Sequence, residues 1–464
     1  MRVINISTSS ILSSVLKECK PTKIEEKRML KLYDDINSKI TNISKNYNIS
    51  DIKLGGSLAK GTWLKNNADI DIFIKLPSNC TKKDLDNSLE IGQSVLKEYK
   101  PYLKYSEHPY VEAQVPFGKS SKVKVNIVSC YDVSKGNWKS SADRSPYHTT
   151  FIKSHLSSKK KDEVRLLKAF LFANKLYGAE IKIQGFSGYI CEFLILKYGS
   201  FIKLLRAMSK LDQSSTILLD DKDFIFSHLH DTQNLKILDP IDPKRNLATA
   251  ISPYNLSKFI FLSNAFLNNP SKHYFKHRQI HLNYNLLDNV LLISFNHKSR
   301  PVDILWGQLR KSLKHINLSF EKNDFHVIRS TIASNDSTES IFVFLLKNLK
   351  LDNAKLHMGP DIVMFNQSTK FLDTNKTKRI ITWIGNDGRL YSLNFRKNND
   401  IRSFFKILIS NEKQFGMSKG IKFDFKHNYK LVTGKPILSL AKNKPWLYSS
   451  LGDIIGTESY LSQN

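Results

Sequence analysis

The sequence is short of acidic residues and of cysteines. Its 464 residues include 42 Asp and Glu against 71 Lys and Arg, a formal net charge of +29. Such an imbalance favours a polyanionic partner, with nucleic acid first, and the alternative is a generally basic protein without one. The four cysteines are far apart and include no CxxC pair. Their spacing argues against a zinc site or a disulfide framework and fits a reducing cytoplasm.

Long apolar runs are also missing. No stretch of about 18 apolar residues occurs, so no membrane span is expected. The first 20 residues scatter their apolar side chains among serines, which argues against a secretory signal. Hydrophobic residues still make up 41% of the chain and aromatic residues 11%, which predicts a globular protein of two to four domains. We therefore expect a cytoplasmic protein that does not contact membranes.

Hydrophobic periodicity divides the chain into three expected parts. A mixed α/β domain covers 1–145, a mainly helical domain covers 146–275, and a C-terminal region covers 276–464. Helices are expected at 22–47, 84–97, 159–178, 187–208, 255–268 and 303–316, and a short one runs from the Gly-Gly-Ser turn through Leu64. Strands are expected at 52–54, 70–76, 102–106, 110–115, 122–128, 290–295, 325–332 and 341–346. The βαββ order from 290 to 346 suggests a ferredoxin-like or RRM-like sheet, and a later hairpin should turn at GNDG, 385–388.

The stretch LGGSLAKGTWLKNNADIDIFIKLP, 54–77, carries the strongest chemical signal. Asp69 and Asp71 are two residues apart in an expected strand, so their side chains share one face. Two adjacent carboxylates repel each other unless a cation bridges them, and Mg²⁺ prefers such oxygen ligands together with substrate phosphates. The Gly-Gly-Ser turn starts a helix whose free N–H groups favour a phosphate, to which Ser57 adds a hydroxyl and Lys60 a positive charge.

The same stretch resembles the head of the nucleotidyltransferase superfamily typified by DNA polymerase β, and more narrowly the archaeal-class (class I) CCA-adding enzymes. Further stretches resemble that family, among them EHPYVEA (107–113), ADRSPYH (142–148), EVRLLKAFLFANKLYGAE (163–180), GFSGYICE (185–192), DPIDPKRN (239–246) and DILWGQLRKS (303–312). The resemblance covers most of residues 20–320 and is traceable afterwards, as at HMGP (357–360).

The resemblance implies an α+β multidomain fold with a polymerase-β-like palm, a helical central domain and C-terminal RNA-binding domains. It also implies Mg²⁺-dependent, template-independent addition of C, C and A from CTP and ATP to the 3′ end of tRNA, with contacts to the acceptor stem. Matching positions imply that Ser57 and Lys60 contact the nucleotide phosphates, that His148, Lys168 and Tyr177 hold the triphosphate and sugar, and that Arg245 reads the base edge. The sequence leaves the oligomeric state open.

The third metal ligand of that family departs from the pattern here. The family places a carboxylate on a later strand, and the matching position in KVKVNIVSCYDV, 122–133, is Asn126. An amide offers one neutral oxygen, so we expect binding to survive and the chemical step to slow. Three explanations stay open: an introduced substitution, a degenerate or binding-only relative, or compensation by Glu112 or Asp132. Asp132 is too far along the strand for direct replacement, and the facing of Glu112 is undetermined.

Two rival functions follow from the same residues. One is a catalytically silent tRNA-binding relative that keeps the fold, which the asparagine favours. The other is a poly(A) polymerase or oligoadenylate synthetase relative, which shares the Gly-Ser turn and the paired aspartates. The nucleotides that the chain adds, if it adds any, separate all three.

Overall fold

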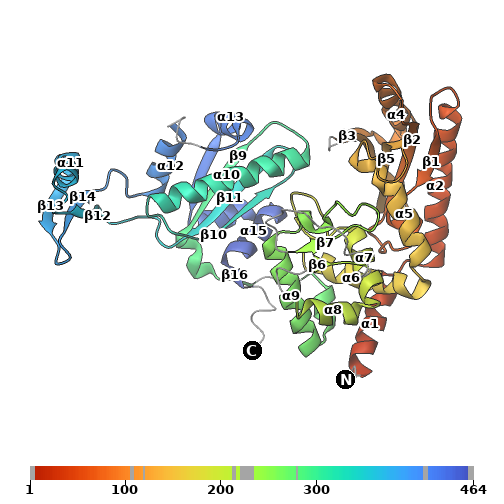
Figure 1. Cartoon of the computed structure of the whole chain (residues 1–464), viewed down its shortest axis with the longest axis horizontal. Coiled ribbons are helices and arrows are strands. Elements are labelled where there is room, and N and C mark those ends of the chain that lie inside the picture. The colour runs from red at the N-terminus through yellow and green to blue at the C-terminus, as the bar shows by residue number, and fades with distance from the viewer. Residues whose placement is uncertain are drawn as a thin grey trace. The chain divides into compact units, whose positions relative to one another are not determined.

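The computed structural model describes residues 6–104, 109–118, 121–211, 216–219, 235–277, 281–410 and 416–457. The chain divides into two compact units, Met1–Arg278 and Gln279–Asn464 (Figure 1). Among the described residues, no helix is at once long enough and apolar enough to cross a membrane. The division of the chain into three domains stays a prediction.

Unit 1 begins with a five-stranded mixed sheet in the order β1-β2-β5-β4-β3. The central pair, β2 and β5, is parallel, and the other neighbours are antiparallel. The strands are β1 (Asp51–Leu54), β2 (Asp69–Pro77), β3 (Tyr102–Lys104), β4 (Tyr110–Phe117) and β5 (Ser121–Asp132). Each of the five expected strands is present. In the expected strand 102–106, residues 105 and 106 lie outside the described residues.

Two capped helices cover the apolar side of this sheet. α2 (Lys23–Ser44) starts with a capping box formed by Thr22 and Glu25, and α4 (Lys82–Val95) starts with one formed by Thr81 and Asp84. Capping boxes satisfy backbone N–H groups that the first helical turn leaves without partners. The core between helices and sheet contains Met29, Ile36, Ile40, Ile70, Ile72, Ile74, Ile91, Val111, Val125 and Ile127.

The short helix after the Gly-Gly-Ser turn does not extend through Leu64 as expected. α3 (Gly56–Lys60) ends after five residues because Gly61 takes the left-handed conformation, with φ +67°. Leu64 instead forms an isolated bridge with Asn67. The turn returns the chain to β2 and leaves Lys60 buried at the end of the helix.

The rest of unit 1 is mainly helical, as expected. Its elements are α1 (Ile6–Cys19), α5 (Arg144–His155), α6 (Ser158–Ala173), α7 (Gly188–Tyr198), α8 (Phe201–Met208), α9 (Pro253–Asn268) and the paired short strands β6 (Thr216–Ile217) and β7 (Lys236–Ile237). The single helix expected at 187–208 is two helices. Gly199, at φ +84°, ends α7, and the Ser200 side chain caps α8. α1 was not expected.

Unit 2 contains a four-stranded antiparallel sheet in the order β10-β11-β9-β15. In chain order this is 2-3-1-4, the arrangement of a ferredoxin-like split βαβ fold. Its strands are β9 (Val290–Asn296), β10 (Val327–Ser334), β11 (Glu339–Leu346) and β15 (Tyr429–Thr433). Its helices are α10 (Val302–Lys322), α12 (Ile401–Ser410), α13 (Lys419–His427), α14 (Pro436–Ala441) and α15 (Pro445–Ile455). Short strands β8 (His281–Leu282) and β16 (Gly456–Thr457) pair with each other. The first three sheet strands and the long helix were expected, and β15 was not.

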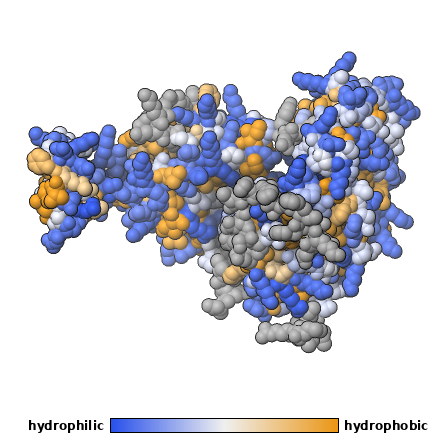
Figure 2. Space-filling view, in the orientation of Figure 1, coloured by the Kyte–Doolittle hydropathy of each residue, from blue (hydrophilic) through white to orange (hydrophobic). Residues whose placement is uncertain are grey.

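A smaller sheet is inserted between β11 and α12. It has the order β12-β14-β13, formed by β12 (Ala354–Asp361), β13 (Arg379–Ile384) and β14 (Arg389–Phe395). α11 (Phe365–Asn375) packs against it. The hairpin at GNDG is confirmed: Gly388, at φ +76°, lies in the turn that joins β13 to β14. Hydrophobic surface gathers on this subdomain (Figure 2).

Candidate active site

One row of polar side chains crosses the sheet of unit 1. Asp71 on β2 is opposite Asn126 on β5, which is opposite Glu112 on β4, which is opposite Tyr102 on β3. Residues in register share one face of a sheet, so these four side chains lie on the same side. Asp69 is two residues from Asp71 and belongs to the same face. The prediction that the two aspartates share a strand and a face is confirmed.

The glycine turn is packed against the second aspartate. Gly55 N–H donates to the backbone oxygen of Asp71 over 2.8 Å. Gly56 has φ +63°, and a Cβ at this position would overlap the Asp71 carboxylate. Any larger residue would therefore displace the carboxylate as well as strain the backbone. Ser57 is the next residue, on the first turn of α3.

Asn126 is tied to the same aspartate. Its Nδ2 donates to Asp71 Oδ1 over 2.8 Å, while its own Oδ1 is buried without a hydrogen-bond partner. Burial raises the pKa of the Asp71 carboxyl above its ordinary value, and the Asn126 hydrogen bond opposes this effect. An orphaned buried acceptor costs about 1–3 kcal/mol, so the site is incomplete as it stands.

The residues around this point fit a hard cation. Asp69, Asp71 and the free oxygen of Asn126 offer oxygen ligands only, which Mg²⁺ prefers. Lys124 Nζ is 3.0 Å from Asp69 Oδ2, so a cation would compete with this ammonium group for the carboxylate. Within the described part of the chain, no cluster of three Asp, Glu, His or Cys side chains has metal-binding spacing. The ligand set therefore depends on the Asn126 amide oxygen.

The two acids considered as substitutes for a third carboxylate are engaged elsewhere. Glu112 faces the correct side of the sheet, but one of its oxygens accepts from the Tyr102 hydroxyl and the other from Lys104 Nζ at 3.1 Å. Asp132 is opposite Pro77 at the far end of β5 and lies 2.6 Å from Lys75 Nζ. The contacts of Glu112 and Asp132 are therefore with residues other than Asp71.

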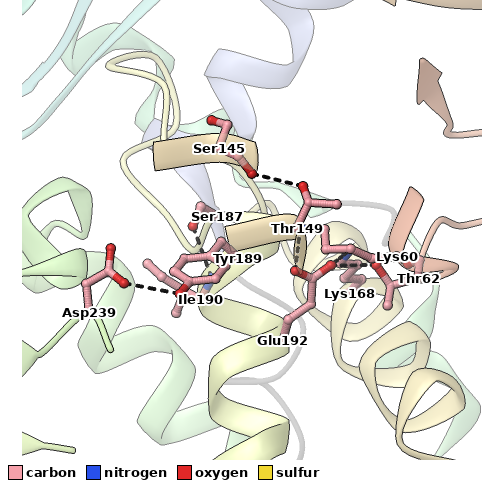
Figure 3. Close-up of polar contacts among 10 residues, drawn as sticks. All are labelled: Lys60, Thr62, Ser145, Thr149, Lys168, Ser187, Tyr189, Ile190, Glu192 and Asp239. Atoms are coloured by element: carbon pink, nitrogen blue, oxygen red, sulfur yellow. Dashed lines mark hydrogen bonds and ion pairs between the residues drawn. The ribbon is translucent and has the colours of Figure 1, made fainter. Parts of the chain in front are cut away.

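A buried ionic cluster joins the Gly-Ser turn to the helical part of unit 1 (Figure 3). Glu192 on α7 lies 2.5 Å from Lys60 Nζ and accepts from the Thr62 hydroxyl over 2.5 Å. Lys168 Nζ is 3.1 Å from that hydroxyl and 3.4 Å from Glu192. All four side chains are buried. Lys60 and Lys168 were predicted as nucleotide-binding residues, but Glu192 was not predicted. The sequence does mark Glu192 as unusual, because it is a single acid inside the apolar run YICEFLIL.

The cluster contains two lysines and one carboxylate. Burial lowers the pKa of the Lys168 ammonium, which disfavours its charged form. Burial alone would raise the pKa of Glu192, but Lys60 and Lys168 hold it below its ordinary value. An added anion beside the lysines, such as a phosphate, would favour the charged form of Lys168.

Tyr177 lies beside this cluster. A Cβ at Gly188, the first residue of α7, would lie 3.0 Å from the Tyr177 hydroxyl and 3.6 Å from Lys168 Nζ. The helix start therefore brings Tyr177 and Lys168 to one place. Burial raises the pKa of the Tyr177 hydroxyl well above its ordinary value, so this group stays a hydrogen-bond donor.

A second buried carboxylate, Asp239, gathers the remaining expected residues. It is 2.8 Å from His148 Nε2 and accepts from the Tyr189 hydroxyl over 3.1 Å. The His148 and Tyr189 rings stack with centroids 3.9 Å apart. Arg245 Nη1 is 3.7 Å from Asp239, and the Arg245 side chain is 44% exposed, so its guanidinium can still reach a ligand. Asp239 and Tyr189 were not among the predicted site residues.

Helix α7 links the two clusters. Tyr189 and Glu192 are three residues apart, so they project from the same side of the helix. Lys60 Nζ also lies 5.9 Å from the centre of the Tyr189 ring. The structure thus brings Lys60, Lys168 and Tyr177 together and joins His148 to Arg245 through Asp239. Asp69, Asp71 and Asn126 lie on the sheet, where the charge of Lys60 opposes the rise that burial causes in the pKa of Asp71, and the charge of Asp69 adds to the rise that burial causes in the pKa of Tyr177.

Comparisons with known proteins cover nearly the whole chain. Three family profiles match: a nucleotidyltransferase domain at 37–135, the second domain of tRNA nucleotidyltransferase at 162–276, and the C-terminal domain of CCA-adding enzymes at 288–434. The CCA-adding enzyme of Saccharolobus shibatae is 33% identical over 399 residues, which cover 85% of this chain and 91% of that enzyme. The CCA-adding enzyme of Methanococcus maripaludis is 35% identical, covering 78% and 84%. A solved structure of the Cid1 poly(U) polymerase aligns with 59% of this chain and 99% of that chain, with TM-score 0.48 and 14% identity.

Proposed function

The chain belongs to the family of CCA-adding enzymes, and from this premise we propose that it adds C, C and A to the 3′ end of tRNA from CTP and ATP. It is a nucleotidyltransferase with the polymerase-β-like fold. The observation that carries the proposal is the extent of the kinship, about a third identity over 85% of the chain. A similarity confined to the nucleotidyltransferase domain would not have indicated the substrate.

The proposed reaction is an in-line displacement. The terminal hydroxyl oxygen of the tRNA forms a bond to the α-phosphorus of the nucleotide, the bond to the β-phosphate breaks, and pyrophosphate leaves with both electrons. Asp69 and Asp71 would hold Mg²⁺, which supplies charge neutralisation of the triphosphate when bound. The hydroxyl proton is released to solvent as this bond forms, and the Asn126 amide cannot serve as the base that accepts it.

The buried lysines support a triphosphate site. We assign Lys60 and Lys168 to the phosphates, together with Ser57, because the two buried lysines share the single carboxylate of Glu192 and a phosphate beside them would favour their charged forms. Tyr177 would donate to the sugar or phosphate beside them. His148, held by Asp239, would complete the sugar and triphosphate contacts, and the exposed guanidinium of Arg245 would read the base edge.

The asparagine supports a slow chemical step. Asn126 donates to Asp71 Oδ1, and its own neutral oxygen would attract a cation less than a carboxylate does. We therefore propose that nucleotide and tRNA bind, while the transfer step is slower than in a chain with aspartate at this position. A catalytically silent tRNA-binding protein is the second candidate function, and the same contact favours it.

A transfer assay distinguishes the candidates. The full chain is incubated with Mg²⁺, one labelled nucleotide at a time, and tRNA lacking its terminal A. Addition of one A followed by arrest supports CCA addition. Binding of the tRNA without any addition supports the silent protein. Long A tails contradict both and favour a poly(A) polymerase.

A further inference from the structure

Lys124 lies on the same face of the sheet as the candidate metal ligands. It is opposite Asp69 in the register of β2 and β5, and it precedes Asn126 by two residues on β5. Because side chains two residues apart on a strand share a face, Lys124 is on the side that carries Asp71. Its ion pair with the first aspartate is short, with Lys124 Nζ 3.0 Å from Asp69 Oδ2. Lys124 was not among the predicted site residues.

The carboxylates of this face differ in whether they already have an ammonium partner. Glu112 is paired with Lys104 at 3.1 Å, and Asp69 is paired with Lys124. Asp71 forms no ion pair with the residues that the structure describes, and it accepts a hydrogen bond from a neutral amide instead. An entering cation therefore displaces no ammonium group at Asp71, whereas at Asp69 it meets one.

The charges of the site limit how many divalent ions it can accept. Asp69, Asp71 and Lys124 together carry one net negative charge, and the Asn126 amide adds none. Two-metal sites hold their ions about 3.5–4 Å apart, and the repulsion between two such ions has to be balanced by several carboxylates. A single divalent ion at Asp71 and at the second oxygen of Asp69 leaves only one positive charge, which nucleotide phosphates would offset.

We propose that Lys124 is a built-in cation of this site: its ammonium group stays at Asp69, so the chain holds one Mg²⁺ together with the nucleotide and excludes a second. Because it concerns the same carboxylates, this role of Lys124 rests on the proposed function. Lys124 is a positioning residue, since it fixes the Asp69 carboxylate and does not touch the substrate. An ammonium group neutralises a carboxylate, but it has no open coordination position at which a hydroxyl could bind and lose its proton.

Two other roles of Lys124 compete with this one. The first is a surface ion pair that opens freely and has no effect on cations, as many exposed pairs do. The Lys124 side chain is only 33% exposed, however, and partly buried pairs are screened less by salt. The second is a contact with a tRNA phosphate, but an ammonium group that is paired with Asp69 attracts a phosphate less than an unpaired one does.

Binding of Mn²⁺ to the nucleotide-free full chain tests the proposal without turnover. Electron paramagnetic resonance of free Mn²⁺ gives the affinity. Lys124→Gln should bind Mn²⁺ at least tenfold more tightly than the natural chain, because Asp69 becomes available and a nearby positive charge is removed.

Lys75→Gln is the matched control. Lys75 also lies on β2, four residues after Asp71 and on the same face, and its Nζ is 2.6 Å from Asp132. Four residues span about 13 Å along a strand, which exceeds the distance over which salt screens exposed charges. Lys75→Gln should therefore change the Mn²⁺ affinity less than twofold, and both variants should keep the circular dichroism spectrum of the natural chain.

The number of ions bound with a nucleotide gives a second measurement. With saturating Mn²⁺ and a CTP analogue that has a methylene group between its α- and β-phosphorus atoms, the natural chain should hold one Mn²⁺ per nucleotide and Lys124→Gln should hold two. Two ions in the natural chain overturn the proposal, and so does Lys124→Gln with an unchanged affinity for Mn²⁺.

The outcomes also distinguish this role of Lys124 from the proposed function. A chain that binds Mn²⁺ as expected but transfers no nucleotide to tRNA contradicts the proposed function alone. The nucleotide-free measurement decides the role of Lys124 even where the analogue does not bind. Weaker tRNA binding by Lys124→Gln, with Mn²⁺ binding equal to that of the natural chain, overturns the proposal in favour of a phosphate contact.

Discussion

Replacement of Asn126 by aspartate tests the reading of the metal site without depending on turnover. In the natural chain the amide donates to Asp71 Oδ1 over 2.8 Å. Asn126→Asp replaces this attraction with two carboxylate oxygens about 3 Å apart. At an effective dielectric constant of about 20, their repulsion is on the order of 5 kcal/mol. Proton uptake by the pair limits the cost, so we expect a loss of about 3–5 kcal/mol when no divalent cation is present.

The expected shift is large enough for a simple melting experiment. One kcal/mol moves the melting temperature of a domain of this size by about 2–4 °C. Without Mg²⁺, Asn126→Asp should therefore melt on the order of 10 °C below the natural chain. With millimolar Mg²⁺ it should recover most of this loss, because a cation between the carboxylates replaces repulsion with attraction. The natural chain should gain much less from Mg²⁺.

A neutral variant separates charge from the loss of a hydrogen bond. Asn126→Ala removes the amide without adding a carboxylate, so it should lose about 1–2 kcal/mol and gain nothing further from Mg²⁺. Transfer by Asn126→Asp should also be faster than in the natural chain, on the order of 100-fold. Equal Mg²⁺-dependent melting shifts in the natural chain and in Asn126→Asp would refute the assignment of Asn126 to the third ligand position.

The remaining predictions concern the buried carboxylates and the charge of the chain. Glu192→Gln should lower the free energy of unfolding by about 3–5 kcal/mol, because it leaves two buried lysines without a counter-ion. Urea titrations would measure this loss. The control Glu98→Gln, which removes a carboxylate from an exposed ion pair, should cause no measurable loss. Burial holds the pKa of His148 below its ordinary value, so the unfolded chain takes up a proton there first and stability should fall as the pH drops below about 6.5. The pKa of Asp239 is lowered, so its contribution is fully present only above about pH 4 and is lost as the pH falls from there through the lowered value. His148→Gln should reduce the difference between urea midpoints at pH 7.5 and 5.5, and an unchanged difference would contradict this assignment. The logarithm of the tRNA association constant should fall linearly with the logarithm of salt concentration, as filter binding between 50 and 200 mM salt would measure; a flat dependence would argue against phosphate contacts.

Local patterns in the sequence were sufficient for the sheet that holds the aspartates. Alternation in DIDIFIKL placed Asp69 and Asp71 on one face of a strand, because the side-chain period of a strand is two. The helical periodicity of residues 22–47 likewise predicted α2, because this pattern also depends only on residues close together in the sequence. The helix expected at 187–208 failed at one residue: the apolar period continues through Gly199, but its left-handed conformation separates α7 from α8. Periodicity alone does not detect such a break.

Contacts between distant residues could not be predicted in the same way. Glu192 is 132 residues from Lys60, and Asp239 is 91 residues from His148. Each acid lay within a stretch that resembles the family, but only the fold brings it to its basic partner. A single acid in an apolar helix was nevertheless a usable signal, since a buried carboxylate needs a partner of opposite charge. Applied to YICEFLIL, that rule would have predicted a buried cation beside Glu192, though not which one.

The position of Asn126 was predicted, but the full effect of this residue on cation binding depends on the orientation of its amide. Its strand was predicted, and the family resemblance implied its position as the third metal ligand, but neither indicated the direction in which its amide points. The Nδ2 group faces Asp71, and an N–H group cannot ligate a cation. Coordination through Asn126 therefore requires the amide to turn and its hydrogen bond to Asp71 to break. A hydrogen bond to a carboxylate contributes about 1.5–3 kcal/mol, which corresponds to roughly a 10- to 100-fold loss of cation affinity. An aspartate at this position would lose no such bond, so the weakness of the site follows from the donor end of the amide as well as from the missing charge.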